Sequence, residues 1–226
     1  MSESDQPPNR PTVPPPNRSS VPVKICGLTR PEDAAAAVRL GAASLGVIFA
    51  GGPRQVTLDQ ARAVVAVAGH LPVFGVFGSQ GRGEILHTCQ RAGLSGAQLH
   101  AGGSAETVAP LRTAGLEVIA VVHLAAPADL DQLDQQRQFG CPIMIEPRVA
   151  GKLGGTGIAL SLELATAARA RLRGHRMLLA GGLTPENVAA AVAAVRPDAV
   201  DVSSGVEHLP GIKDQQRMTQ FFGALR

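Results

Sequence analysis

The stretch that decides the fold is RMLLAGGLTPENVAAAVAAVRPDAVDVSSG, residues 176–205. Two short apolar runs, at 176–182 and 198–205, flank an alanine- and valine-rich segment of helical length. We predict a strand, a helix and a second strand, with Thr184 as the N-cap of the helix and Pro185 as its first residue. Two strands joined by a helical crossover run parallel, so the stretch is one unit of a parallel sheet.

The same alternation extends back to Val21. It predicts further strands at 21–26, 44–49, 72–77, 96–100, 116–124 and 141–146, each followed by a helix, and a last helix over 214–224. The strands are continuously apolar, as expected when both faces of a sheet are covered. Eight such units predict an α/β protein with a closed (β/α)8 TIM barrel. The alternative is an open doubly wound sheet, which usually has fewer units and often a GxGxxG after its first strand.

The composition separates a short tail from a single globular domain. The chain has 226 residues, of which 45% are hydrophobic, enough to bury a sizeable core. Residues 1–20, MSESDQPPNRPTVPPPNRSS, are rich in proline and polar residues and nearly free of apolar side chains. Such a segment cannot bury enough surface to offset its ordering entropy, so we expect a disordered tail at 1–20 and a barrel over 21–226.

Charge and cysteine usage narrow the classes of partner. The net charge is +3, the basic residues are scattered, and there is no Trp or Tyr, so the sequence lacks the basic stripe and stacking aromatics of a nucleic-acid binder. No apolar run is long enough to span a membrane, and the N-terminus lacks a signal peptide. The three cysteines are widely spaced without a CxxC motif, which favours a reducing cytoplasm over a disulfide framework or a zinc site.

Five polar side chains are placed at the end of the barrel where TIM-barrel active sites lie, because they end or follow predicted strands. They are Cys26, Arg54, His100, Glu146 and Asp201. From position alone, Cys26 is as well explained by a buried core residue as by a reactive thiol. A single histidine among scattered acids lacks metal-ligand spacing, so we expect no metal and no cofactor.

Cys89 falls inside a predicted helix, and Cys141 begins a strand at the opposite end of the barrel. Both are expected to be small buried hydrophobic residues.

Glycine-rich turns follow the last three strands: GGTG (154–157), AGG (180–182) and SSG (203–205). Glycine lets backbone N–H groups approach an anion closely, and the loops after strands 7 and 8 are the recurring phosphate site of this fold. We therefore expect phosphate binding at this side, by Gly155, Gly157, Gly181, Gly182, Ser204 and Gly205. An acid and a base across a bound sugar phosphate could convert an aldose to a ketose without a cofactor.

Several of these segments resemble the phosphoribosylanthranilate isomerase family of tryptophan biosynthesis. The matching segments, in order from residue 23 onward, are KICGLTRPEDA, GVIFAGGPRQVT, QLH, GGTG, AGGLTPENV, DVSSGVE and PGIKD. The resemblance implies an Amadori rearrangement of N-(5'-phosphoribosyl)anthranilate. We expect the protein to be a monomer or homodimer. The resemblance also implies that Glu146 protonates the furanose ring oxygen and that Cys26 removes the C2' proton. Arg54 and Asp201 would contact substrate, Arg54 at the anthranilate carboxylate, while His100 lines the pocket and the glycine-rich loops hold the phosphate.

The chain departs from the family where the family usually carries aspartate at the end of strand 6. Glu146 stands there instead, and its added methylene moves the carboxyl by about 1.5 Å, a displacement that can cost ~100-fold in rate. The alternative function is therefore a diverged barrel that binds a sugar phosphate without turnover; isomerisation of a different aminosugar phosphate is a third reading. For Cys26 to act as a base, we expect Lys24, two residues away on the same strand face, to lower its pKa.

Overall fold

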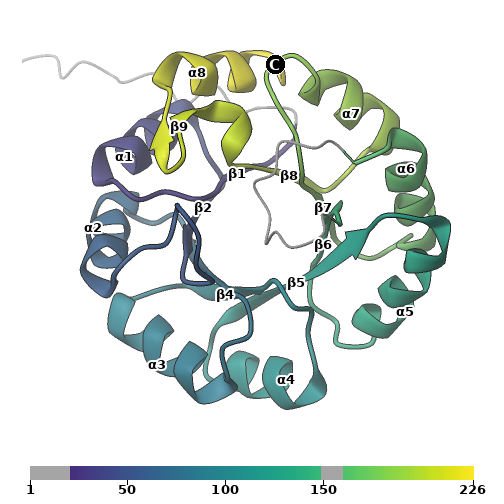
Figure 1. Cartoon of the computed structure of the whole chain (residues 1–226), viewed down its shortest axis with the longest axis horizontal. Helices are drawn as coiled ribbons and strands as arrows, with labels where there is room; N and C mark the ends of the chain where they lie inside the picture. The colour runs from purple at the N-terminus through teal and green to yellow at the C-terminus, as the bar shows by residue number, and fades with distance from the viewer. Residues whose placement is uncertain (1–20, 149–159) are drawn as a thin grey trace, which may run out of the picture.

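The computed structural model describes residues 21–148 and 160–226. Eight parallel strands close into a barrel in sequence order, and helices surround them (Figure 1). The strands are β1 Val23–Ile25, β2 Ser44–Ile48, β3 Val73–Phe77, β4 Gly96–Leu99, β5 Glu117–Leu124, β6 Ile143–Pro147, β7 Met177–Leu179 and β8 Ala199–Val202. The helices are α1 Pro31–Leu40, α2 Leu58–Ala68, α3 Arg82–Ala92, α4 Ala105–Thr113, α5 Asp131–Arg137, α6 Leu162–Arg171, α7 Val188–Val195 and α8 Gln215–Gly223. The predicted (β/α)8 barrel is confirmed.

The barrel closes where the first strand pairs with the last. β1 pairs with β8 in parallel, with Val23 opposite Val200 and Lys24 opposite Asp201. A small antiparallel hairpin, β9 Glu207–Leu209 with β10 Ile212–Lys213, follows β8 and was not predicted. It lies between the barrel mouth and α8 (Figure 1), beside the ends of β1 and β8.

The stretch 176–205 forms the predicted strand, helix and strand, but its helix begins later than predicted. α7 starts at Val188, because the Asn187 side chain closes a turn ahead of it. Its Oδ1 accepts from the Thr184 N–H at 2.8 Å, and its Nδ2 donates to the Gly182 carbonyl at 2.9 Å. Thr184 is therefore a turn residue, and the prediction that it caps the helix was wrong.

Both strands of this stretch also end earlier than predicted. β7 stops at Leu179, and Gly181 and Gly182 follow with φ of +89° and +63°, outside the extended conformation. After β8, the chain turns into a short 3-10 helix at Ser204–Val206. These early ends place backbone turns at the barrel mouth.

Two apolar layers hold the barrel together. Residues on the outer faces of the strands pack against the helices, and a smaller cluster fills the inside of the barrel. The inner cluster consists of Phe74, Ile119, Val121, Met144, Leu178, Ala180 and Ala199. Alternate residues of each strand point inward, as expected for a filled TIM-barrel interior.

The inside of the barrel also contains a buried charge pair. Lys24 is 1% exposed, and its Nζ lies 2.6 Å from Asp201 Oδ1 and 2.9 Å from Gln98 Oε1. Burial alone would lower the pKa of Lys24, but the nearby Asp201 and Cys26 outweigh it and raise that pKa. Lys24 therefore remains a cation inside the barrel.

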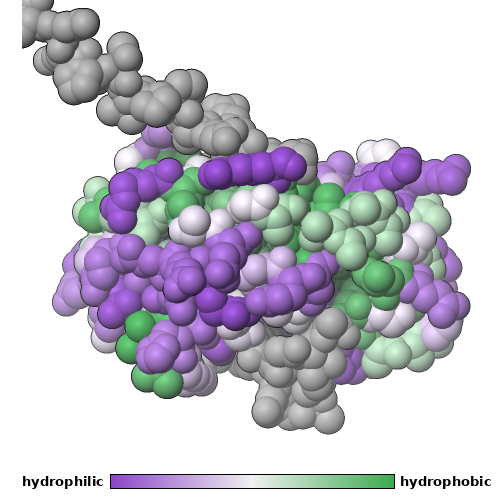
Figure 2. All heavy atoms as spheres, turned by 90° about the horizontal axis from the view of Figure 1, so that it is seen from above, coloured by the Kyte–Doolittle hydropathy of each residue, from purple (hydrophilic) through white to green (hydrophobic). Residues whose placement is uncertain are grey.

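The outer surface carries both hydrophilic and hydrophobic side chains. Hydrophilic side chains form much of the face shown in Figure 2, with hydrophobic areas between them. Among the helices of residues 21–148 and 160–226, none combines the length and apolar character needed to cross a membrane.

Replacing Lys24 with methionine should leave Asp201 buried without its partner. We expect Lys24→Met to lower the free energy of unfolding by about 3–5 kcal/mol, measured by denaturant unfolding. The double variant Lys24→Met/Asp201→Leu removes both charges and should recover most of the loss. Equal stability of the single variant and the wild type would show that the pair does not stabilise the barrel.

Candidate active site

The five polar residues predicted at the barrel mouth line one cavity. It has a volume of about 50 Å³, and its walls include Cys26, Arg54, His100, Glu146 and Asp201. They come from strands or loops around the whole ring, so the strand-end rule brought together residues that are far apart in the sequence. Gly155 and Gly157 lie outside the described residues.

Cys26 immediately follows β1 and is buried. Its N–H donates to the Val202 carbonyl at 2.9 Å, which continues the pairing of β1 with β8. Gly46 on β2 makes room for the thiol: a Cβ there would lie 2.8 Å from Cys26 Sγ and 3.0 Å from Lys24 Nζ. Any larger residue at 46 would displace the sulfur.

The environment of Cys26 raises the pKa of its thiol. Burial is the largest cause, and Asp201 adds to it, while Lys24 and Lys213 act in the opposite direction without cancelling them. The prediction of a lowered pKa was therefore wrong. It considered the charge of Lys24 but not the desolvation of the sulfur.

The other two cysteines lie away from the cavity. Cys89 is buried in α3, and burial raises its pKa to about 12. Cys141 is buried just before β6, at the opposite end of the barrel. Their positions agree with the predicted structural role.

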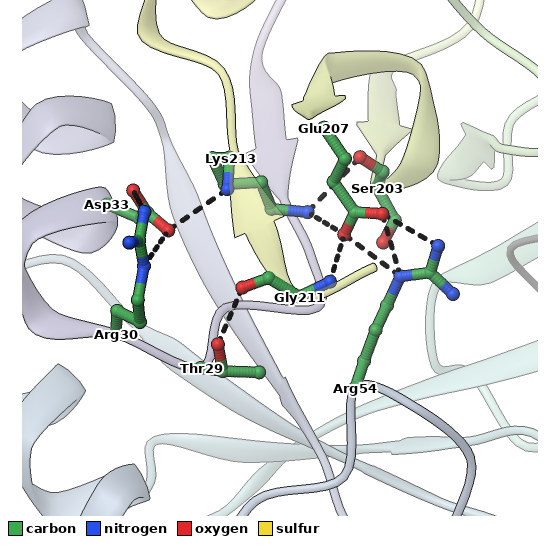
Figure 3. A network of polar contacts seen from close by, with 8 residues as sticks. All are labelled: Thr29, Arg30, Asp33, Arg54, Ser203, Glu207, Gly211 and Lys213. Carbon is green, nitrogen blue, oxygen red and sulfur yellow. Dashed lines mark hydrogen bonds and ion pairs between the residues drawn. The ribbon is translucent and has the colours of Figure 1, made fainter. Parts of the chain in front are cut away.

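An ion pair from the hairpin holds Arg54 at the cavity (Figure 3). Arg54 Nε and Nη2 donate to Glu207 on β9 at 2.7–3.0 Å, which is a bidentate arrangement. Both side chains are largely buried. No hydrogen bond of Arg54 Nη1 to the described residues is found, so this nitrogen is available to a carboxylate.

Lys213 on β10 completes this network. Its Nζ donates to Glu207 Oε1 at 2.8 Å and to the Ser203 carbonyl at 3.1 Å, as Figure 3 shows. Burial alone would raise the pKa of Glu207, but Arg54 and Lys213 together lower it. The motif residues Glu207 and Lys213 thus position Arg54 and the loop after β8.

Thr29 and Asp33 tie the same hairpin to the start of α1. The Thr29 hydroxyl donates to the Gly211 carbonyl at 2.6 Å, and the Lys213 N–H donates to Asp33 Oδ2 at 3.0 Å (Figure 3). The hairpin is therefore fixed to the first and the last units of the barrel.

On the other side of the cavity, Glu146 meets two histidines. Glu146 Oε1 lies 3.0 Å from His100 Nε2 and 2.9 Å from His123 Nε2. His123 is on β5, directly beside Glu146 in the parallel register of β5 and β6. His123 was not predicted as a site residue, although it stands near the end of the predicted strand 116–124, where TIM-barrel active-site residues lie.

Burial and the neighbouring His123 lower the pKa of His100, and Glu146 opposes this shift only in part. His100 is therefore neutral at pH 7.

The predicted phosphate side is formed by the turns after β7 and β8. A Cβ on Gly205 would collide with the Leu183 carbonyl oxygen, so the two turns are in direct contact. Gly181 and Gly182 lie in the first turn and Ser204 and Gly205 in the second. Ser203 Oγ is buried at the cavity wall and has no hydrogen-bond partner among the described residues.

Comparison with known proteins gives a consistent match. Residues 23–224 match the family described as N-(5'phosphoribosyl)anthranilate (PRA) isomerase. A relative from Trichlorobacter lovleyi, named N-(5'-phosphoribosyl)anthranilate isomerase, is 38% identical over 204 residues, which cover 88% of this chain and 95% of the relative.

Solved structures agree with the sequence match. The phosphoribosyl anthranilate isomerase of Thermus thermophilus superposes with a TM-score of 0.80 at 34% identity, covering 91% of this chain and 98% of that one. A phosphoribosyl anthranilate isomerase in complex with reduced 1-(o-carboxyphenylamino)-1-deoxyribulose 5-phosphate gives a TM-score of 0.78 at 31% identity, with the same coverage.

The raised pKa of Cys26 can be measured by alkylation. We expect the rate of reaction with iodoacetamide, followed at Cys26 by peptide mass spectrometry, to rise with pH with a midpoint above ~8.5, the ordinary value for a thiol. A synthetic peptide of residues 21–30 is the control, because its thiol is exposed to water. A midpoint at or below that of the peptide would contradict the effect of burial.

Proposed function

The chain belongs to the N-(5'-phosphoribosyl)anthranilate isomerase family, and from this premise we propose that it catalyses that reaction in tryptophan biosynthesis. The product is 1-(2-carboxyphenylamino)-1-deoxyribulose 5-phosphate. The observation that carries the proposal is the cavity at the barrel mouth, where a thiol from the end of β1 and a carboxyl from β6 face one space.

In the first step Glu146 acts as the general acid. It donates a proton to the furanose ring oxygen, the C1'–O bond breaks, and the substrate nitrogen forms a Schiff base with C1'. Glu146 is 7% exposed and lines the cavity in which the sugar would lie, so its carboxyl is placed to act on bound substrate.

In the second step Cys26 acts as the general base. The thiolate takes the proton from C2', the electrons of that C–H bond form the C1'=C2' double bond of an enolamine, and the enolamine tautomerises to the ketone. Because burial raises the pKa of Cys26, only a small fraction is thiolate at neutral pH. The Lys24 ammonium beneath it stabilises that thiolate.

Three groups would hold the substrate around these two. Arg54, fixed by Glu207, offers Nη1 to the anthranilate carboxylate. Ser203 Oγ and the turns at Gly182 and Ser204 face the side where the sugar phosphate would lie. Asp201 is held by Lys24 and borders the space between them.

The first test is the decay of phosphoribosylanthranilate fluorescence with the purified chain. We expect turnover, and we expect Cys26→Ser to lower kcat by about 10²–10⁴-fold, the usual contribution of a general base. Cys89→Ala, which changes a buried thiol outside the cavity, is the matched control and should retain turnover.

Binding of the reduced product analogue without any turnover by the wild type would indicate instead a diverged barrel that binds a sugar phosphate. Unchanged turnover in Cys26→Ser would show that the thiol is not the general base.

The length of the Glu146 side chain gives a second test. Aspartate would withdraw the carboxyl from both histidines, so we expect Glu146→Asp to lower kcat by ~100-fold, as a displacement of about 1 Å can do. Glu146→Gln keeps the length and removes the acid, and should be at least as slow. A gain of activity in Glu146→Asp would show that the pocket is not built around glutamate.

A further inference from the structure

Three side chains converge at the ends of neighbouring strands β4, β5 and β6. His100 follows β4, His123 lies on β5 and Glu146 on β6. The two Nε2 atoms are 3.2 Å apart, and each lies within 3.0 Å of Glu146 Oε1. The three atoms form a nearly equilateral triangle.

A hydrogen bond between the two ring nitrogens accounts for only one side of this triangle. Glu146 Oε1 is buried and has no hydrogen-bond partner in the described part of the chain, although two ring nitrogens lie at 2.9 and 3.0 Å. The N–H directions therefore do not point at the oxygen. Between the two ring nitrogens only one proton can lie, so one nitrogen faces the triangle with its lone pair.

A cation above the triangle would satisfy all three atoms. Imidazole nitrogens and carboxylate oxygens bind a first-row divalent ion at about 2.0–2.2 Å, and two such ligands at the right angles of an octahedral site are then about 3.0 Å apart. The observed separations of 2.9, 3.0 and 3.2 Å match this spacing on all three sides. Two histidines and one carboxylate on one face are the ligand set of many first-row divalent metal sites.

The remaining coordination positions have room. His100 and Glu146 line the cavity of about 50 Å³ at the barrel mouth, beside Cys26 and Ser203. One bound water needs roughly 10–15 Å³, so water or a substrate oxygen fits beside an ion there. Three protein ligands with open positions are typical of catalytic rather than structural metal sites.

We propose that His100, His123 and Glu146 bind a first-row divalent cation of the Zn²⁺, Fe²⁺ or Mn²⁺ class at the barrel mouth. The site was not expected from the sequence, because His123 was not considered. A cation and a proton exclude each other at Glu146 Oε1. A cation bound there would be a Lewis acid at the position of the Glu146 carboxyl.

Metal binding can be tested with the full chain after removal of metal by a chelator. We titrate Zn²⁺ in competition with a chromophoric chelator, and separately record the absorption spectrum of the Co²⁺ form. We expect one ion per chain. His123→Gln and Glu146→Gln should each weaken binding by at least ~100-fold, since even partners of metal ligands contribute 10–100-fold.

The matched control is His87→Gln, which changes an exposed histidine on α3 and should leave binding unchanged. Circular dichroism confirms that each variant is folded. Absence of binding, equal binding by His123→Gln, or a cobalt–thiolate charge-transfer band, which would place the ion on a cysteine, overturns the proposal. The titration contains no substrate, so its result is independent of whether the chain turns over phosphoribosylanthranilate.

Discussion

The ion pair of Lys24 with Asp201 is the constraint on which the barrel mouth depends. The two residues are register partners across the β1–β8 seam that closes the barrel, and they lie inside it with Gln98 as a third partner. A buried charge is tolerated only when it is paired and hydrogen-bonded. The pair therefore fixes the relative position of the first and last strands. Cys26 and Ser203 follow it by two residues, directly after the ends of β1 and β8.

A second charged network, formed by Arg54, Glu207 and Lys213, stiffens the part of the cavity wall that contains Arg54. The Glu207 carboxylate accepts hydrogen bonds from Arg54, Lys213 and the Gly211 N–H, so it joins the hairpin to the loop after β2. Lys213 also donates to the Ser203 carbonyl and so ties the end of β8 to the same network. A guanidinium already held by two hydrogen bonds loses little further freedom when it binds a carboxylate. In the proposed function, the hairpin motif would therefore act through Arg54 without contacting the substrate itself.

Most of the barrel and of its candidate site could be predicted from the sequence, because in a TIM barrel the strand pattern also places the active-site residues. Continuously apolar strands separated by helices predict a barrel, and in a barrel the strand ends converge. Cys26 and Glu146 therefore line one cavity although they are distant in the chain. The features that the sequence could not predict depend on tertiary contacts. The start of α7 is set by the Asn187 side chain, and the raised pKa of Cys26 is set by burial. His123 lies near the end of β5, so its place at the barrel mouth could have been predicted from the sequence, but it was overlooked.

Glu146 takes part in both the proposed isomerisation and the proposed metal site. A shorter carboxylate on β6 could not reach His100 and His123 at once, because both contacts already lie at 2.9–3.0 Å from the end of the longer side chain. The extra methylene of glutamate, compared with aspartate, therefore brings the carboxyl within contact distance of both imidazoles. With a proton on that oxygen, the site is an acid opposite a thiol. With a cation there, the same geometry places an electrophile opposite the same thiol. In the proposed function Cys26 is the base, and in either form β6 places an electron-withdrawing centre across the cavity from it.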